Sequence, residues 1–161
     1  MDGSDGLTRI YYLKFKLILI LFIFRMKEKE VTEKILRAYY TVYNTLGYGF
    51  LERVYENAML IELKKQGLDC IQQKAIDVYY DCILVGEYYA DIVVNNLVIV
   101  ELKSVENLKY EHECQLTNYL KATDIEIGLI LNFGKKPEFK RKIFTNKSEG
   151  GVGGLNKLYE D

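Results

Sequence analysis

Three charged residues occur in two segments that otherwise have the composition of β-strands. Asp91 lies in "ADIVV", and Glu101 and Lys103 lie in "LVIVELKS" just after Asn95-Asn96. Because burial of an unpaired charge costs several kcal/mol, these residues either face solvent on a hairpin or converge on a ligand. Glu101 and Lys103 are two positions apart in a strand, so they project from the same face of the sheet.

The length of the loop at Asn95-Asn96 decides whether Asp91 joins them. A two-residue turn would direct Asp91 to the face away from Glu101, whereas a three-residue loop that includes Leu97 would place the two carboxylates opposite each other. Asn tolerates the left-handed backbone conformation that the longer loop needs. A functional site therefore predicts the three-residue loop, or a bulge with the same effect.

Two carboxylates and an ammonium at one place have the chemistry of a metal site. Neighbouring carboxylates repel each other, but a divalent cation removes this cost, and Mg²⁺ accepts one or two carboxylates together with water and phosphate. We therefore expect Asp91, Glu101 and the backbone carbonyl of Leu102 to hold Mg²⁺, with Mn²⁺ as the alternative ion. Lys103 would then orient an attacking hydroxide or offset charge on a pentavalent phosphorane, as metal-dependent phosphodiester hydrolysis requires.

The elements that must position these groups follow from the periodicity of apolar residues. The pattern predicts seven elements in the order α-α-β-β-β-α-β. They span about residues 32–46, 50–66, 70–80, 82–94, 97–103, 108–123 and 126–134. Thr32 is the expected N-cap of the first helix and Gly47 its expected stop. An antiparallel meander, a crossover helix and a returning strand predict an α/β domain with a mixed sheet.

The two ends of the chain differ in composition from the segment between them. The apolar run Leu17–Phe24 is eight residues long, too short to span a bilayer, where about 20 residues are needed. We expect residues 1–25 to be an extension ahead of a start at Met26 and outside the fold, with no stable membrane insertion. A weak membrane-surface anchor is the alternative. The domain would cover residues 26–147, and the Gly-rich residues 148–161 would form a flexible tail.

The composition indicates a single soluble domain. The chain has 161 residues, 49% of them apolar and 28% charged, which suffices for one hydrophobic core. Its formal net charge of −1 gives no overall attraction to nucleic acid, so such binding requires a local patch. The three cysteines are widely spaced without a CxxC pair, which favours reduced thiols in a cytoplasmic protein over disulfides or a zinc site.

The segment from Lys135 to Lys147 is a candidate for that patch. It contains six basic residues and one acidic residue, Glu138. The residues that we expect to bind substrate phosphate are Lys136, Lys140, Arg141 and Lys142. The alternative is that the segment forms a solvated final helix.

The same residues resemble a known group of proteins. The pattern "D…ELK" formed by Asp91 and residues 101–103 resembles the PD-(D/E)XK nuclease superfamily. Upstream, "GFLERVY" (49–55) resembles the motif of the GxxExxY proteins, a family placed in that superfamily, and "HECQLTNYL" (112–120) follows at the expected distance. The resemblance covers most of the chain, from residue 26 to about residue 147.

The resemblance implies a restriction-endonuclease-like fold with core order αβββαβ and a mixed central sheet flanked by helices. It implies Mg²⁺-dependent hydrolysis of nucleic acid phosphodiester bonds, with DNA preferred over RNA as substrate. It also implies that Glu52 supports the metal site, through water or by holding Lys103. Gln115 would position that lysine or a substrate phosphate, and Tyr119 would contact the substrate.

Less specific interpretations remain open for each motif. A catalytically silent module of the same fold would bind nucleic acid or protein instead of cleaving it. Glu52 and Glu56 would then belong to an ordinary solvated helix face, and a lone His112 is more often structural or solvent-facing than catalytic. We expect Tyr55 to pack in the core with a tethered hydroxyl, and Gly49 to permit the turn between the first two helices.

Overall fold

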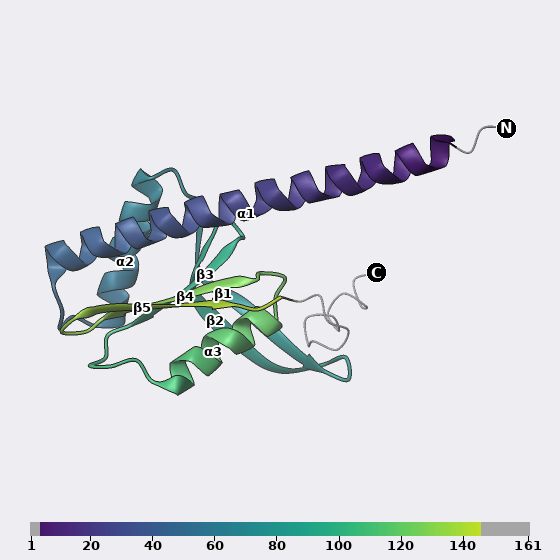
Figure 1. Ribbon diagram of the computed structural model, residues 1–161. Coiled ribbons are helices and arrows are strands. Elements are labelled where there is room, and N and C mark those ends of the chain that lie inside the picture. Colours follow the sequence, from purple (N-terminus) through teal and green to yellow (C-terminus); the bar gives the residue numbers. More distant parts are fainter. Residues whose placement is uncertain (1–3, 146–161) are drawn as a thin grey trace.

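The computed structural model describes residues 4–145, with side chains from residue 9 onward, and contains three helices and five strands (Figure 1). The elements are α1 Ser4–Leu46, α2 Glu52–Lys65, β1 Cys70–Tyr80, β2 Ile83–Val94, β3 Val98–Lys103, α3 Tyr110–Lys121, β4 Ile127–Phe133 and β5 Pro137–Ile143. The predicted order of the first seven elements is confirmed. Lys147 and the expected Gly-rich tail lie outside the described residues.

The five strands form one mixed sheet in the order β1-β2-β3-β4-β5. The pairs β1–β2, β2–β3 and β4–β5 are antiparallel, whereas β3 and β4 are parallel and joined through α3. All seven residues of β4 are buried, as expected for an apolar strand covered on both faces. The predicted α/β fold with a mixed sheet flanked by helices is therefore confirmed.

Helices cover both faces of the sheet. In Figure 1, α1 and α2 lie on one side of the strands and α3 lies on the other. The core on the α1–α2 side contains large side chains such as Ile35, Tyr39 and Met59. On the other side α3 approaches β4 closely, because a Cβ added at Gly128 would lie 2.6 Å from Leu116 Cδ1. The sheet is thus held between two apolar layers.

The first helix begins much earlier than the sequence predicted. Thr32 is not an N-cap, because it lies inside α1 and its hydroxyl donates to the Glu28 carbonyl at 2.8 Å. The residues before it contain no breaker after Gly6, and ion pairs one helical turn apart add support, such as Lys34–Glu30 at 2.9 Å. The predicted end was right: α1 stops at Leu46, and Gly47 has a left-handed φ of +67°.

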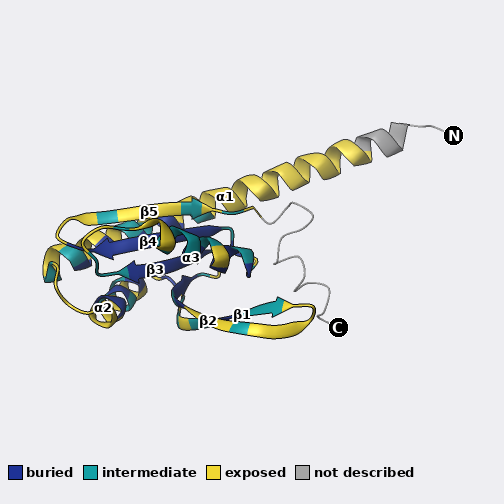
Figure 2. Cartoon of the chain, turned by 90° about the horizontal axis from the view of Figure 1, so that it is seen from below, coloured by how far each residue is buried: buried dark blue, intermediate teal, exposed yellow. Residues whose placement is uncertain are grey.

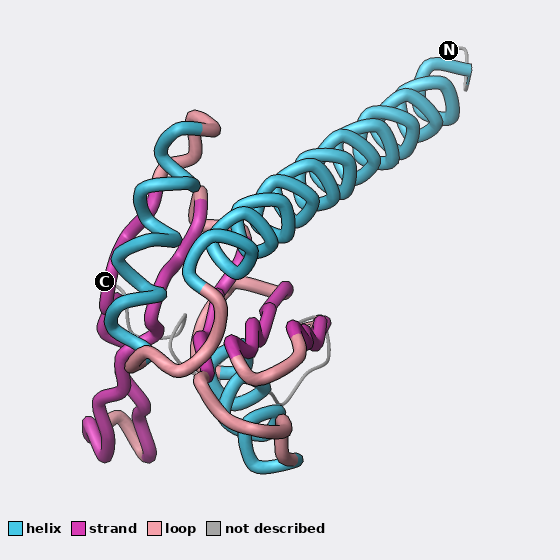
Figure 3. The backbone as a smooth tube through the Cα atoms, turned by 90° about the vertical axis from the view of Figure 1, so that its left-hand side faces the viewer, coloured by secondary structure: helices cyan, strands magenta, loops and turns pink. Residues whose placement is uncertain are grey.

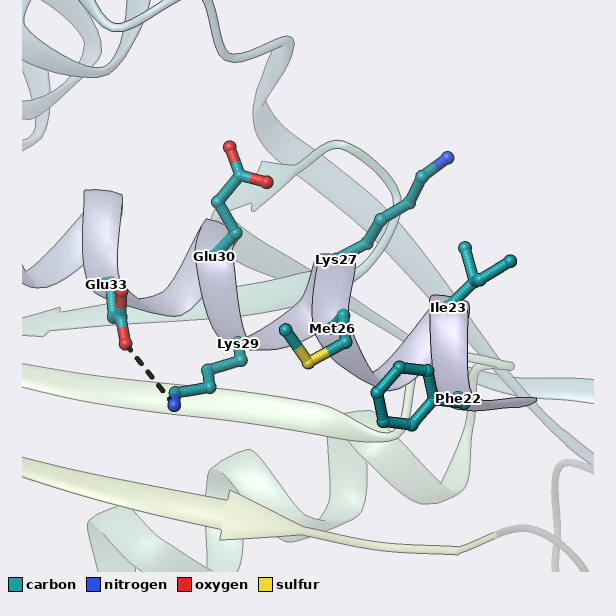
Figure 4. A pocket seen from close by; sticks show the side chains of 7 residues that line it. All are labelled: Phe22, Ile23, Met26, Lys27, Lys29, Glu30 and Glu33. Atoms are coloured by element: carbon teal, nitrogen blue, oxygen red, sulfur yellow. Dashed lines mark ion pairs between the residues drawn. The ribbon is translucent and has the colours of Figure 1, made fainter. Parts of the chain in front are cut away.

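The N-terminal half of α1 projects beyond the domain. Figures 2 and 3 show it leaving the body of the protein, and from residue 9 to residue 26 its side chains are exposed. Figure 4 shows part of this surface, where Phe22 and Met26 lie on the same side of the helix as the Lys29–Glu33 ion pair and Ile23 points to the other side. In the part of the chain that the structure describes, no helix is long and apolar enough to cross a membrane.

The basic segment forms a strand and not a helix. Pro137 begins β5, which pairs with β4 along its whole length, from Phe133–Pro137 to Ile127–Ile143. Without β5, the backbone polar groups along one side of β4 would lack partners, so this pairing outweighs the helix propensity of Lys and Arg. The alternative of a solvated final helix was therefore wrong for the described part of this segment, residues 135–145.

Candidate active site

The hairpin between β2 and β3 has the register that brings the carboxylates together. Val94 pairs with Val98, which leaves residues 95–97 as a three-residue loop. Asn95 and Asn96 both have a left-handed φ of +52°, the conformation expected of Asn in such a loop. The predicted odd-length loop is therefore confirmed.

Asp91 and Glu101 meet across this hairpin. The backbone N–H of Leu102 donates to Asp91 Oδ2 at 2.8 Å, and the backbone N–H of Asp91 donates to Glu101 Oε1 at 3.4 Å. Lys103 Nζ lies 3.5 Å from Glu101 Oε2. Glu101 is only 2% exposed, so it is not part of a solvated pair on the surface. The three charged side chains thus form one cluster.

Burial sets the electrostatics of this cluster. Loss of solvent, together with the charge of Asp91, raises the pKa of Glu101 to about 8, and Lys103 offsets only part of the effect. Burial also raises the pKa of Asp91, against the hydrogen bond from the Leu102 N–H. One ammonium therefore does not compensate the buried Glu101 and the half-buried Asp91. A cation placed between them would stabilise their ionised forms.

The donor set fits a hard cation better than zinc. Among the described residues, no group of three or more His, Cys, Asp or Glu side chains could hold a metal ion. A site at Asp91 and Glu101 would therefore complete its coordination with the Leu102 carbonyl and water, which Mg²⁺ accepts. Structural zinc sites instead use four protein ligands, mainly Cys and His.

Two glutamates on α2 lie near the cluster, and they differ in environment. Glu52 is exposed, and its Oε1 accepts from the backbone N–H of Ser104, one residue after Lys103, at 3.2 Å. Glu56, one turn later, is only 4% exposed and pairs with Arg53 at 3.2 Å. A solvated face is therefore wrong for Glu56. Its spacing of four from Glu52, which puts both on one helix face, could have indicated that Glu56 also faces the cluster.

Gln73 on β1 also contacts the cluster, and the sequence does not predict it. Its Nε2 donates to Glu56 Oε1 at 3.0 Å and to Asp91 Oδ1 at 3.3 Å. Gln73 also has a left-handed φ of +50°. It therefore links the helix carboxylate to the strand carboxylate. No motif in the sequence indicates this contact.

Gln115 and Tyr119, the two predicted site residues of α3, lie one turn apart on that helix. Gln115 Nε2 donates to the hydroxyl of Tyr119 at 2.7 Å, and no described contact joins Gln115 to Lys103. Tyr119 is 5% exposed, and its pKa is raised by burial and, in part, by the charges of Glu101 and Asp91. Tyr119 therefore lies close enough to the carboxylates to interact with them.

A groove of about 620 Å³ runs beside this pair between α3 and the β1–β2 hairpin. Its lining includes Gln115, Tyr119 and two exposed aromatic residues, Tyr88 and Tyr110. Tyr88 and Tyr119 contact each other, with ring centroids 5.9 Å apart. The groove therefore shares Tyr119 with the surroundings of the carboxylate cluster.

Three other motif residues have structural roles. Tyr55 is fully buried, stacks on Phe133 with ring centroids 4.0 Å apart, and donates its hydroxyl to the Gly47 carbonyl at 2.9 Å. Gly49 has a φ of +106°, which a residue with a side chain rarely adopts. His112 Nδ1 accepts from the backbone N–H of Lys109 at 3.1 Å and so caps α3.

The basic residues of β5 do not gather on one surface. Lys140 lies 3.5 Å from Glu113 on α3, and Lys142 forms a closer ion pair with the same carboxylate. Arg141 points to the opposite side, where its charge acts on Glu28 of α1. Lys136 is exposed in the turn before β5. Among the described residues, the four expected phosphate-binding side chains are thus divided between separate places.

Comparison with known proteins gives one family. The sequence profile of the PD-(D/E)XK nuclease superfamily matches residues 29–142, which include every residue of the carboxylate cluster. A search of curated proteins and a search of solved structures find no match.

Proposed function

Because the chain belongs to the PD-(D/E)XK nuclease superfamily, we propose that it is a Mg²⁺-dependent nuclease that hydrolyses phosphodiester bonds. The observation that carries the proposal is the meeting of Asp91 and Glu101 across the β2–β3 hairpin, with Lys103 Nζ 3.5 Å from Glu101 Oε2. A buried and a half-buried carboxylate beside a single ammonium are costly for a module that binds no metal.

In this proposal Asp91, Glu101 and the Leu102 carbonyl hold the ion. A bound Mg²⁺ or Mn²⁺ supplies a water of lowered pKa and polarises the scissile phosphate. Lys103 donates to that water or to a phosphate oxygen, because its ammonium projects from the same face of β3 as Glu101. Each of these groups lies on a paired strand, which keeps it in position.

The surrounding polar residues have supporting roles in the proposal. Glu52 holds the chain just after Lys103 through the Ser104 N–H. Gln115 and Tyr119 are joined by a hydrogen bond at the edge of the groove, where they would contact the substrate backbone. Lys136, Lys140, Arg141 and Lys142 would contribute only long-range attraction, since their side chains are dispersed.

The spacing of Gly49, Glu52 and Tyr55 supports a finer assignment to the GxxExxY proteins. We further propose that the folded domain is residues 26–147, that the protein is cytoplasmic, and that DNA is preferred over RNA. The three unpaired cysteines among the described residues support a reducing compartment.

The test is cleavage of a panel of single- and double-stranded DNA and RNA by the purified chain with Mg²⁺ or Mn²⁺. We expect activity that disappears with a chelator and falls by about 10²–10³-fold in Lys103→Ala. The matched control is Lys64→Ala, an exposed lysine on α2, which should cleave like the wild type. A wild type that binds no divalent ion would instead favour the catalytically silent binding module.

A further inference from the structure

Gln73 has an unusual backbone conformation for its place in the fold. Five described residues other than glycine have a positive φ. Four of them lie in the two hairpin loops of the sheet: Asp81, Cys82, Asn95 and Asn96. Gln73 instead lies inside β1, where its φ of +50° is strained for a residue with a side chain.

The local strand pairing shows what this conformation does. Gln72 pairs with Ile92 and Lys74 with Ala90, so Gln73 lies opposite Asp91 without a regular pairing of its own. The Gln72 amide points elsewhere, toward Asn57 Oδ1 at 3.3 Å. The irregularity therefore directs one of two adjacent glutamines to the carboxylate cluster.

Packing does not account for the strained residue, because Gln73 is exposed. Instead, its side-chain Nε2 donates two hydrogen bonds, at 3.0 Å to Glu56 Oε1 and at 3.3 Å to Asp91 Oδ1. An amide NH₂ can donate to two acceptors at once and adds no charge, so it can join two carboxylates without neutralising either.

These contacts extend into a chain of side chains. Arg53 Nη1 lies 3.2 Å from Glu56 Oε2, and Glu56 in turn accepts from Gln73, which donates to Asp91. The other oxygen of Asp91 accepts from the Leu102 N–H at 2.8 Å. Both oxygens of Asp91 are thus oriented by donors, and each keeps a lone pair for another partner.

We propose that Gln73 is a positioning residue of the metal site, which fixes the orientation of Asp91 through its side-chain amide and anchors it to Glu56. The proposal rests on the proposed function, since it concerns how Asp91 binds the ion. Partners of this kind, one step removed from the metal, commonly change metal affinity or activity by about 10–100-fold when they are removed.

The experiment compares Gln73→Ala, Gln73→Gly and the matched control Gln72→Ala in the full chain. Calorimetric titration with Mg²⁺ gives the affinity, and thermal unfolding without metal gives the stability. We expect both Gln73 variants to bind Mg²⁺ about 10–100-fold more weakly, and Gln72→Ala to bind it as the wild type does. Gln73→Gly should be at least as stable as Gln73→Ala, because glycine adopts the left-handed conformation without strain.

Gln73→Gly and Gln73→Ala distinguish an effect of the Gln73 side chain from an effect of its backbone conformation. If Gln73→Gly binds Mg²⁺ like the wild type, only the backbone conformation matters and the positioning role is overturned. The same conclusion follows if Gln72→Ala weakens binding as much as Gln73→Gly. If the wild type itself binds no Mg²⁺, the proposed function fails and the role of Gln73 fails with it, which distinguishes this result from the first two.

Discussion

Two regions of the protein depart from the usual rule of apolar inside and charged outside, in opposite directions. At the carboxylate cluster, Glu101 and Glu56 are buried. Along residues 9–26 of α1, large apolar side chains are exposed. Asp91 and the two buried glutamates have hydrogen-bond or ion-pair partners, whereas the large apolar side chains of residues 9–26 face solvent (Figure 2).

The two regions differ in whether their unusual side chains have partners. Each charged side chain of the cluster interacts with a neighbouring residue, so a change in one residue affects the others. In α1, apolar side chains are buried only from Val31 onward, where the helix packs on the sheet. We therefore expect the cluster to be sensitive to single substitutions and the projecting half of α1 to be tolerant of deletion.

The largest effect should come from Asp91→Asn. We expect Mg²⁺ binding to weaken by at least about 100-fold, more than for residues one step removed from the ion. The fold should persist, because the amide oxygen can still accept from the Leu102 N–H. Calorimetry and circular dichroism would measure the two properties, with Asp69→Asn, at an exposed position, as the control. Unchanged Mg²⁺ binding in Asp91→Asn would show that the carboxylate cluster does not hold the ion.

The pH dependence of stability is the second test. Because burial raises the pKa of Glu101 to about 8 from its ordinary value of 4.5, the folded state holds a proton there that the unfolded state releases. The free energy of unfolding of the metal-free protein should therefore fall as the pH rises from 4.5 to about 8.

Chemical denaturation in the presence of a chelator, between about pH 5 and pH 8, would measure this slope. Glu101→Gln should flatten it, because the amide does not titrate. A slope that is equally steep in Glu101→Gln would show that other groups carry the dependence.

The two α2 glutamates give a smaller and more selective effect. Glu56→Ala should lower the free energy of unfolding by about 1–3 kcal/mol, because it removes a buried acceptor of the Gln73 amide. Glu52→Ala should cost less than about 1 kcal/mol, since Glu52 is exposed and its partner, the Ser104 N–H, can bind water instead. Urea denaturation of both variants would compare them. Equal costs would mean that burial does not distinguish the two positions.

The smallest effect should come from deletion of residues 1–25. We expect the free energy of unfolding to change by less than about 0.5 kcal/mol, because the exposed side chains contribute little to the core. Urea denaturation of the shortened and full chains gives this value, and Mg²⁺ titration of both checks the site. Loss of folding or of metal binding would show that the projecting half belongs to the domain.

Much of the fold could be predicted because local signals agreed with the tertiary structure. The Asn95-Asn96 pair indicated a loop that tolerates left-handed backbone, and the apolar run of β4 indicated a strand covered on both faces. The sequence-based prediction was wrong where the local signal for a helix start was weak and where pairing with a neighbouring strand determined the structure. Thr32 has the side chain of an N-cap, but nothing before it breaks the helix. The basic segment of β5 became a strand because β4 needed a neighbour.

The site was only partly predictable, because regular strand geometry positions some of its residues and not others. Asp91, Glu101 and Lys103 lie on adjacent strands, so their proximity could be predicted from the strand period and the length of the loop. Gln73 could not be found this way, because its side chain is directed by an irregularity in β1 that no local sequence signal predicts. Glu56 was overlooked because charge alone suggested exposure.

The parallel pairing of β3 with β4 has a consequence for folding kinetics. Asp91 and Glu101 belong to a hairpin closed by a short loop, and such hairpins form in about 1–10 μs. Val98 can pair with Ile127 only after the chain has crossed over through α3, and such non-local contacts form late. The acidic pair should therefore assemble while water still surrounds it and lose that water only as the last strands close, so that an ion present during refolding would accelerate the final step.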